Sequence, residues 1–147
     1  MILPILDEKN IILNLPLMTK REAIQKAANT LIDNGYVSQE YFMSMLEREN
    51  VGTTYIGNGI AIPHGISHSS DLIHHSGIVI LQFKQAIQYD SEEVHLVIGI
   101  AGKNNTHIEI LSKIAIALLE METVDHIVKS NSEQEIISLF EFNAESE

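Results

Sequence analysis

Apolar residues recur along this chain at helical spacing in its first quarter. Such a stripe follows Thr19 and consists of Ile24, Ala27, Ala28 and Leu31. Thr19 and Glu22 have the spacing of a capping box, which satisfies unpaired N–H groups at a helix start, and Gly35 stands where the helix would end. We therefore expect a helix from Thr19 to the neighbourhood of Gly35.

Four more helices are expected. The second starts at Ser38, an N-cap type of residue, and runs to about Glu49 over a buried stripe of Phe42, Met45 and Leu46. A third begins at another capping box, Thr106-His107-Ile108-Glu109, and continues through Leu119; it is apolar nearly all round, which predicts that it is buried. The last two cover residues 124–129 and the segment after Ser132, where Glu135 completes a capping box.

Four segments read as strands, at residues 10–15, 60–62, 77–83 and 94–101. The last two are rich in Ile, Val and Leu, as central strands covered on both faces are. The predicted order is β-α-α-β-β-β-α-α-α. It indicates an α/β fold, a three-layer helix/sheet/helix sandwich around a mixed β-sheet, formed by residues 1–147 as a single domain.

Composition removes several classes of function. The chain has no cysteine, which excludes thiol chemistry and disulfides, and no apolar run near the ~20 residues that span a bilayer. We expect a soluble, cytoplasmic protein without direct membrane insertion. A net charge of −11 argues against nucleic acid as a partner. An acidic surface would steer a basic protein toward it, although solubility alone also accounts for this charge.

The step Pro63-His64-Gly65 is the first candidate site. Proline restricts the residue before it to extended geometry, and glycine lets the chain turn directly after the imidazole, so few local side chains can cover His64. An ordinary turn that contains a histidine without a function would show the same pattern of residues.

The run Gly57-Asn58-Gly59-Ile60-Ala61-Ile62-Pro63-His64-Gly65 resembles the phosphorylation-site segment of the enzyme IIA proteins of the fructose and mannitol class, which belong to the bacterial phosphoenolpyruvate-dependent sugar phosphotransferase system. The resemblance implies that His64 carries a phosphoryl group. It covers the chain from the first helix to the last and agrees with the predicted fold.

Two further residues are candidates. His107 is expected in the first turn of its helix, where an anion is favoured. It would either contact such an anion or be a residue without a functional role at the helix start. Arg48 would be a solvated charge or a guanidinium that offsets phosphoryl charge. In the mannitol branch, which segments 99–111 and 46–49 resemble, the matching histidine and arginine lie near the phosphorylated one. The resemblance thus makes His64, His107 and Arg48 the catalytic set.

Cofactors and metals are not expected. The spacing of His64 and His68 does not place both rings on one helix face, because Pro63 and Gly65 disfavour a helix there. Gly57-Asn58-Gly59 lacks the remaining residues of a nucleotide-binding loop. His95, in a buried strand, is expected to be packed or hydrogen-bonded.

The resemblance implies a phosphotransferase with protein partners. His64 would accept a phosphoryl group from phospho-HPr and pass it to a cysteine of enzyme IIB, free or fused to membrane enzyme IIC, during uptake of a hexitol such as mannitol. An apolar collar would surround His64. Two alternatives remain open: a regulatory phosphoprotein of the nitrogen-related enzyme IIA branch, and a binding module that has lost phosphorylation. Segments 66–68 and 83–85 depart from the mannitol pattern.

Overall fold

A hairpin of two long apolar strands is the centre of the fold. The computed structural model describes residues 5–66, 69–103 and 106–145, the side chains of 106–108 and 141–145 excepted. The strands are β1 (Ile11–Ile12), β2 (Tyr55–Gly57), β3 (Ile60–Ala61), β4 (Gly77–Tyr89) and β5 (Glu92–Ala101). The helices are α1 (Lys20–Asp33), α2 (Tyr41–Val51), α3 (Thr106–Ala117), α4 (Met121–Lys129) and α5 (Glu133–Glu145), with short 3-10 turns at Glu8–Asn10 and Ser70–Leu72.

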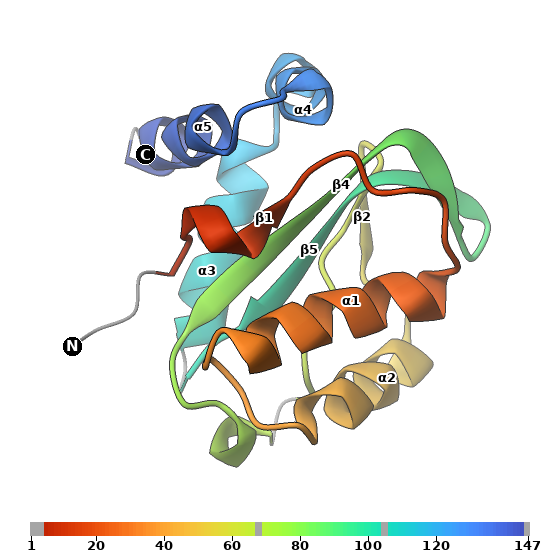
Figure 1. The fold of residues 1–147 in the computed structure, drawn as a ribbon, viewed down its shortest axis with the longest axis vertical. Coiled ribbons are helices and arrows are strands. Elements are labelled where there is room, and N and C mark those ends of the chain that lie inside the picture. Colours follow the sequence, from red (N-terminus) through yellow and green to blue (C-terminus); the bar gives the residue numbers. More distant parts are fainter. Residues whose placement is uncertain (1–4, 67–68, 104–105, 146–147) are drawn as a thin grey trace.

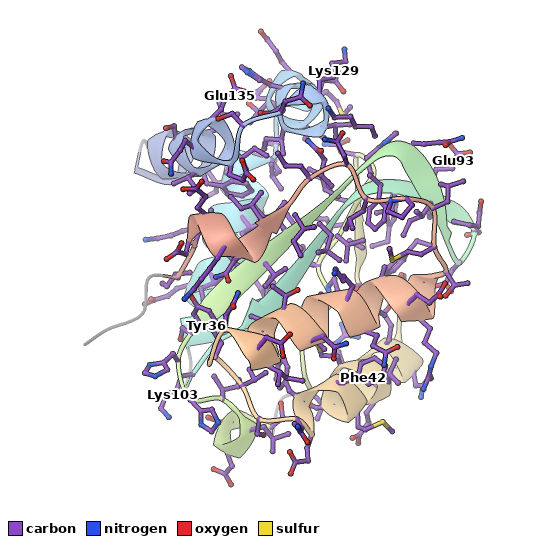
Figure 2. All side chains as sticks on the ribbon, in the orientation of Figure 1. Tyr36, Phe42, Glu93, Lys103, Lys129 and Glu135 are labelled. Carbon is purple, nitrogen blue, oxygen red and sulfur yellow. The ribbon has the colours of Figure 1, made fainter. Side chains whose placement is uncertain are left out.

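The five strands form one mixed sheet in the order β1-β4-β5-β3-β2. β4 pairs antiparallel with β5, while β1 lies parallel to β4 and β3 lies parallel to β5. Because β3 and β5 run the same way, their carboxyl ends meet at one edge of the sheet. Figure 2 labels Glu93 near the start of β5 and Lys103 just beyond its end, so Lys103 marks that edge.

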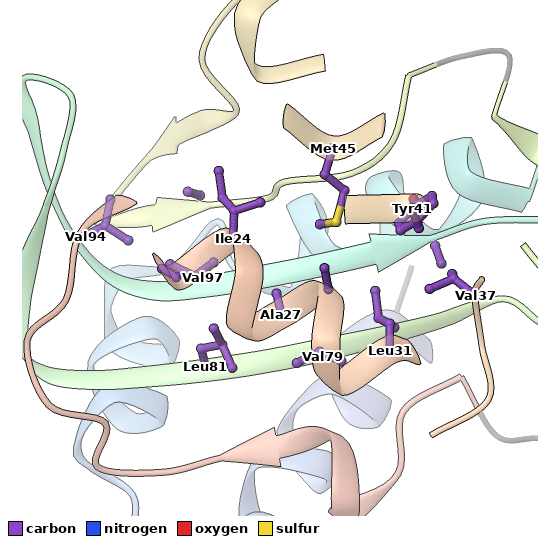
Figure 3. Close-up of a cluster of buried hydrophobic side chains, with 14 of the residues drawn as sticks. Ile24, Ala27, Leu31, Val37, Tyr41, Met45, Val79, Leu81, Val94 and Val97 are labelled. Atoms are coloured by element: carbon purple, nitrogen blue, oxygen red, sulfur yellow. The ribbon is translucent and has the colours of Figure 1, made fainter. Parts of the chain in front are cut away.

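Helices cover both faces of the sheet (Figure 1). α1 and α2 pack on one face, and α3, α4 and α5 bury their apolar residues against the other. Figure 3 shows side chains of the first core where α1 and α2 meet β4 and β5, with labels on Ile24, Ala27, Leu31, Val37, Tyr41, Met45, Val79, Leu81, Val94 and Val97. The predicted fold class, helices on both faces of a mixed sheet, is confirmed.

Strand β2 is absent from the predicted order. It forms a hairpin with β3 through Asn58 and Gly59, whose φ angles of 55° and 76° are both positive. Positive φ at both central residues matches the twist of paired strands, and Asn-Gly is the strongest short-range hairpin signal. The sequence therefore held the evidence for β2 in Asn58-Gly59, a pair that the predicted strands left out.

Two helix predictions are wrong in detail. The second helix begins at Tyr41 rather than at Ser38, and the buried hydroxyl of Ser38 has no partner within the described part of the chain. The third helix is amphipathic rather than buried all round: Ile110 and Ile114 are buried, whereas Ile116 is 37% exposed. The capping box at Thr19 and Glu22 is confirmed. Within residues 5–66, 69–103 and 106–145, no helix is long and apolar enough to cross a bilayer.

Candidate functional site

His64 lies where the carboxyl ends of β3 and β5 meet. β3 pairs with β5 through Ile60 and Ala61, and the chain continues alongside β5 until His64 forms a parallel bridge with Ile100. The Ile100 N–H donates to the Pro63 carbonyl oxygen at 3.0 Å, which ties the residue before the histidine to the strand. The imidazole therefore stands at the edge of the sheet, half-buried.

The ring of His64 is oriented by its own backbone. Its Nδ1 lies 2.8 Å from the carbonyl oxygen of Ile62. A carbonyl only accepts hydrogen bonds, so Nδ1 is the nitrogen that carries the proton. In the neutral imidazole the in-plane lone pair then belongs to Nε2.

Side chains of α2 hold the backbone that follows His64. The Gly65 N–H donates to the Tyr41 hydroxyl at 2.9 Å, and the Ile66 N–H donates to Ser44 Oγ at 3.0 Å. The Tyr41 hydroxyl in turn donates to the Ile100 carbonyl oxygen at 2.7 Å. Burial raises the pKa of Tyr41 to about 12, although the bond from Gly65 lowers it, so this hydroxyl keeps the proton that it donates. One phenol thus joins the histidine loop to β5.

Close packing leaves no room for a side chain at Gly65. A Cβ on this residue would lie 2.6 Å from Ser69 Oγ, 2.6 Å from a Tyr41 ring carbon and 2.8 Å from Ser44 Oγ. Its φ is not among the positive values of the described glycines, which belong to Gly35, Gly57 and Gly59. The sequence reading, which assigned Gly65 a turning role, identified an important glycine for a different reason.

His64 and Arg48 line the same cleft, of about 370 Å³. Arg48 lies in the last turn of α2 and donates from Nη1 to the Gly52 carbonyl oxygen at 2.8 Å. A guanidinium has five N–H donors, so one bond to Gly52 does not exhaust it. The apolar residues Val51, Ile66, Ile73 and Ile100 also line the cleft, together with Tyr41, Ser69 and Ser70. The other arginine, Arg21, lies over the Phe42 ring instead.

The structure describes the side chains of only some of the other histidines. The backbone places His107 in the first turn of α3, as predicted, but its side chain lies outside the described residues, as do His68 and the Asn104-Asn105 pair. His95 Nδ1 donates to the Phe83 carbonyl oxygen at 2.8 Å, in line with the hydrogen-bonded role expected for it. Within the described residues, no group of three His, Cys, Asp or Glu side chains is arranged to hold a metal ion.

Sequence reasoning missed Tyr41 and Ser44. They precede Arg48 by seven and four residues, and at helical periodicity all three share one face of α2. A tyrosine, a serine and an arginine on one face near a buried stripe form the signal that could have identified them. α2 therefore contributes both the cation of the cleft and the hydroxyls that shape the histidine loop.

The family comparison matches nearly the whole chain. Residues 4–143 match the family model described as "Phosphoenolpyruvate-dependent sugar phosphotransferase system, EIIA 2". The mannitol-specific phosphotransferase enzyme IIA component of Geobacillus stearothermophilus is 47% identical over 140 residues, which cover 95% of this chain and 97% of that protein.

Two solved structures from Escherichia coli share the fold. Its enzyme IIA mannitol superposes with a TM-score of 0.84 at 34% identity, covering 91% of this chain and 97% of the other. A complex of its mannitol enzyme IIA with phosphorylated mannitol enzyme IIB gives 0.85 at 33% identity, covering 90% and 94%.

Proposed function

Because this chain belongs to the EIIA 2 family of the phosphoenolpyruvate-dependent sugar phosphotransferase system, we propose that it is the phosphoryl carrier of a mannitol uptake system. The family makes it a phosphotransferase. The observation that carries the proposal is the arrangement of His64, whose Nδ1 donates to the Ile62 carbonyl while its ring shares a cleft with Arg48. Residues 1–147 act as one enzyme IIA domain.

Nε2 of His64 is the acceptor atom in this proposal. Its lone pair attacks the phosphorus of a donor phosphohistidine, the new N–P bond forms, and the electron pair of the broken N–P bond stays on the donor nitrogen. Nδ1 keeps its proton throughout. The ring gains positive charge as Nε2 bonds to phosphorus, and the Ile62 carbonyl oxygen, 2.8 Å from Nδ1, stabilises that charge. No proton needs to move, so positioning is the main task of the protein.

Arg48 supplies the counter-charge. The transferred phosphoryl group carries negative charge on its equatorial oxygens, and a planar guanidinium can meet two of them. The backbone N–H groups of Gly65 and Ile66, next to His64, already donate to Tyr41 and Ser44. His107, in the first turn of α3, is the second proposed stabilising residue.

The partners follow from the relatives. Mannitol enzyme IIA of Escherichia coli forms a complex with phosphorylated enzyme IIB, and we assign the same acceptor to this chain, with phospho-HPr as the donor on the cytoplasmic side. Enzyme IIB, free or fused to enzyme IIC, would pass the group to mannitol. The relatives at 47% and 34% identity carry mannitol names, which favours transport over the nitrogen-regulatory alternative.

The test is the intact mass of the protein after incubation with phosphoenolpyruvate, enzyme I and HPr. Wild type should gain one acid-labile phosphoryl group and His64→Ala none. His95→Ala is the matched control, because that ring also donates from Nδ1 to a carbonyl but lies outside the cleft, and it should be phosphorylated like wild type. Transfer from the loaded protein to enzyme IIB then separates transport from regulation. An unmodified wild type, or a modified His64→Ala, contradicts the proposal.

A further inference from the structure

Glu49 is a nearly buried carboxylate that the chemistry above does not use. It directly follows Arg48 on α2, and only 5% of its side chain is exposed. It accepts from the Thr54 N–H at 3.0 Å, from Thr54 Oγ1 at 2.6 Å and from the Tyr89 hydroxyl at 3.1 Å. Lys20 Nζ lies 3.0 Å from Oε2, the oxygen that also accepts from the Thr54 N–H. A carboxylate so fully satisfied in a buried place holds its neighbours in one arrangement.

The contacts of Glu49 join distant parts of the chain. Lys20 begins α1, Tyr89 ends β4, and Thr54 follows the turn that leaves α2. Lys20 also pairs with Asp90 at 2.6 Å and lies over the Tyr89 ring. Burial lowers the pKa of Lys20, but its bonds to Asp90 and Glu49 outweigh that effect and leave the pKa raised. Lys20 therefore stays charged and offsets Glu49, which would otherwise oppose an anion beside Arg48.

Two hydrogen bonds connect Thr54 to the ring of His64. The Ile62 N–H donates to the Thr54 carbonyl oxygen at 3.0 Å, and the Ile62 carbonyl oxygen accepts from His64 Nδ1 at 2.8 Å. Where Glu49 holds Thr54, the peptide groups of Ile62 are held as well. The position of the Ile62 carbonyl oxygen determines which ring nitrogen of His64 keeps the proton.

The same turn also holds Arg48. Its guanidinium donates to the Gly52 carbonyl oxygen at 2.8 Å, two residues before Thr54. Glu49 and Arg48, which are adjacent on α2, thus both hydrogen-bond to one short turn, residues 52–54. A change in that turn would move both the cation and the imidazole of the cleft.

We propose that Glu49 is a positioning residue for phosphoryl transfer: through Thr54 it fixes the Nδ1-protonated tautomer of His64 and the place of Arg48. The kinetic consequence rests on the proposed function, whereas the effect on the tautomer does not. Glu49 does not line the cleft, so it acts through its neighbours and not on the phosphoryl group.

The experiment compares Glu49→Ala with Glu47→Ala, which removes the same charge from an exposed position of the same helix. The ring nitrogens of 15N-labelled histidine report the tautomer by NMR at mildly alkaline pH, with His64 assigned by the signal lost in His64→Ala. We expect a single tautomer in wild type and in Glu47→Ala, and a mixture in Glu49→Ala. The kcat of phosphorylation should fall roughly tenfold in Glu49→Ala with an unchanged KM for phospho-HPr, as misplacement of reacting groups predicts.

Glu49→Gln distinguishes hydrogen bonding from charge. Its amide oxygen can accept from the Thr54 N–H, and the hydroxyls of Thr54 and Tyr89 can turn to accept from its NH₂ group. We therefore expect Glu49→Gln to restore the single tautomer and most of the kcat. A mixture in Glu49→Gln equal to that in Glu49→Ala would overturn positioning by hydrogen bonds.

A tautomer in Glu49→Ala identical to that in Glu47→Ala overturns the proposal. If Glu49→Ala does not fold, Glu49→Asp decides, because its shorter side chain keeps the charge but withdraws the carboxylate from both the Thr54 N–H and Thr54 Oγ1; an unchanged tautomer there also overturns the proposal. If wild type accepts no phosphoryl group, the proposed function fails, and the tautomer comparison still decides the role of Glu49.

Discussion

Gly65 and Arg48 show how single residues are constrained at this site. Gly65 has no room for a Cβ, since atoms of Ser69, Tyr41 and Ser44 lie within 2.8 Å of where it would be. Arg48 is held by the Gly52 carbonyl oxygen beside the cleft. Each of these restrictions can be tested by a single substitution.

Gly65→Ala should destabilise the protein by roughly 1–3 kcal/mol, because the added methyl must push apart a packed core contact. Urea unfolding followed by circular dichroism measures this difference. Gly52→Ala is the control: its Cβ would meet nothing within 4 Å, and its φ of 171° suits any residue. Equal unfolding midpoints for the two variants would show that the loop after His64 can accommodate a methyl group at residue 65 without loss of stability.

Arg48→Lys should lower kcat for phosphoryl acceptance roughly tenfold or more, the effect of losing one charged hydrogen bond of about 1.5–3 kcal/mol. Lysine keeps the charge but lacks the planar fork. Rapid-quench phosphorylation by phospho-HPr measures the rate. Arg21→Lys, on the Phe42 ring, should react like wild type, and an equally fast Arg48→Lys would remove the guanidinium from the mechanism.

At the scale of elements, α2 and the α4–α5 junction are each built around polar side chains. One face of α2 carries Tyr41, Ser44 and Arg48 to the site. At the junction, Glu135 accepts from Ser130 Oγ at 2.5 Å and lies 3.1 Å from His126 Nε2. Ser132 Oγ accepts from the Glu135 N–H, so the predicted capping box is half present, and the carboxylate is used to join two helices instead.

Glu135→Gln should destabilise the α4–α5 junction in a pH-dependent way. The bonds to Ser130 and then to His126 lower the pKa of Glu135 from its ordinary value of 4.5. A depressed folded pKa gives stability that is present above 4.5 and is lost as pH falls through the folded pKa. The thermal midpoints of wild type and variant should therefore differ near neutral pH and converge well below 4.5.

Glu133→Gln is the control for that prediction, because it removes the same charge from the first residue of the same helix, α5. Its midpoint should follow that of wild type at each pH. A gap between Glu135→Gln and wild type that persists unchanged into acid would mean that the carboxylate's charge has no part in holding the junction.

At the scale of the whole molecule, the sheet separates two apolar cores and presents His64 at one of its edges. The chain carries 20 acidic and 9 basic residues other than histidine, for a net charge of −11. A strongly charged protein attracts partners of opposite sign over distances that salt shortens. The proposed exchange between two protein partners should therefore depend on ionic strength.

Raising the salt concentration should lower kcat/KM for phosphorylation by phospho-HPr mainly through a higher KM, since screening slows encounter but leaves the chemistry of His64 unchanged. Steady-state rates over a series of sodium chloride concentrations measure it. Sucrose at matched osmolality is the control and should not reproduce the effect. A KM that is insensitive to salt would assign the acidic composition to solubility alone.

Local pattern was sufficient for most elements. The stripe and capping box of α1, the apolar runs of β4 and β5 and the Pro63-His64-Gly65 step are set by neighbours within a few residues. The family resemblance then singled out His64 and Arg48, which the structure brings to one cleft. Even β2, which was missed, had its local sign in Asn58-Gly59.

Only the tertiary structure decided which groups hold these residues in place. Tyr41 meets the Gly65 N–H across 24 residues and the Ile100 carbonyl across 59, and Glu49 meets Tyr89 across 40. No short-range period records such pairs, because each partner is chosen by how the helices pack on the sheet. The sequence by itself determined most of the elements, through propensities and spacings that act locally, and its family resemblance marked His64 as the proposed phosphoryl acceptor. The bond that holds Ile62 to Thr54 beside the His64 ring, and the space around Gly65, were decided by contacts that exist only once the chain is folded.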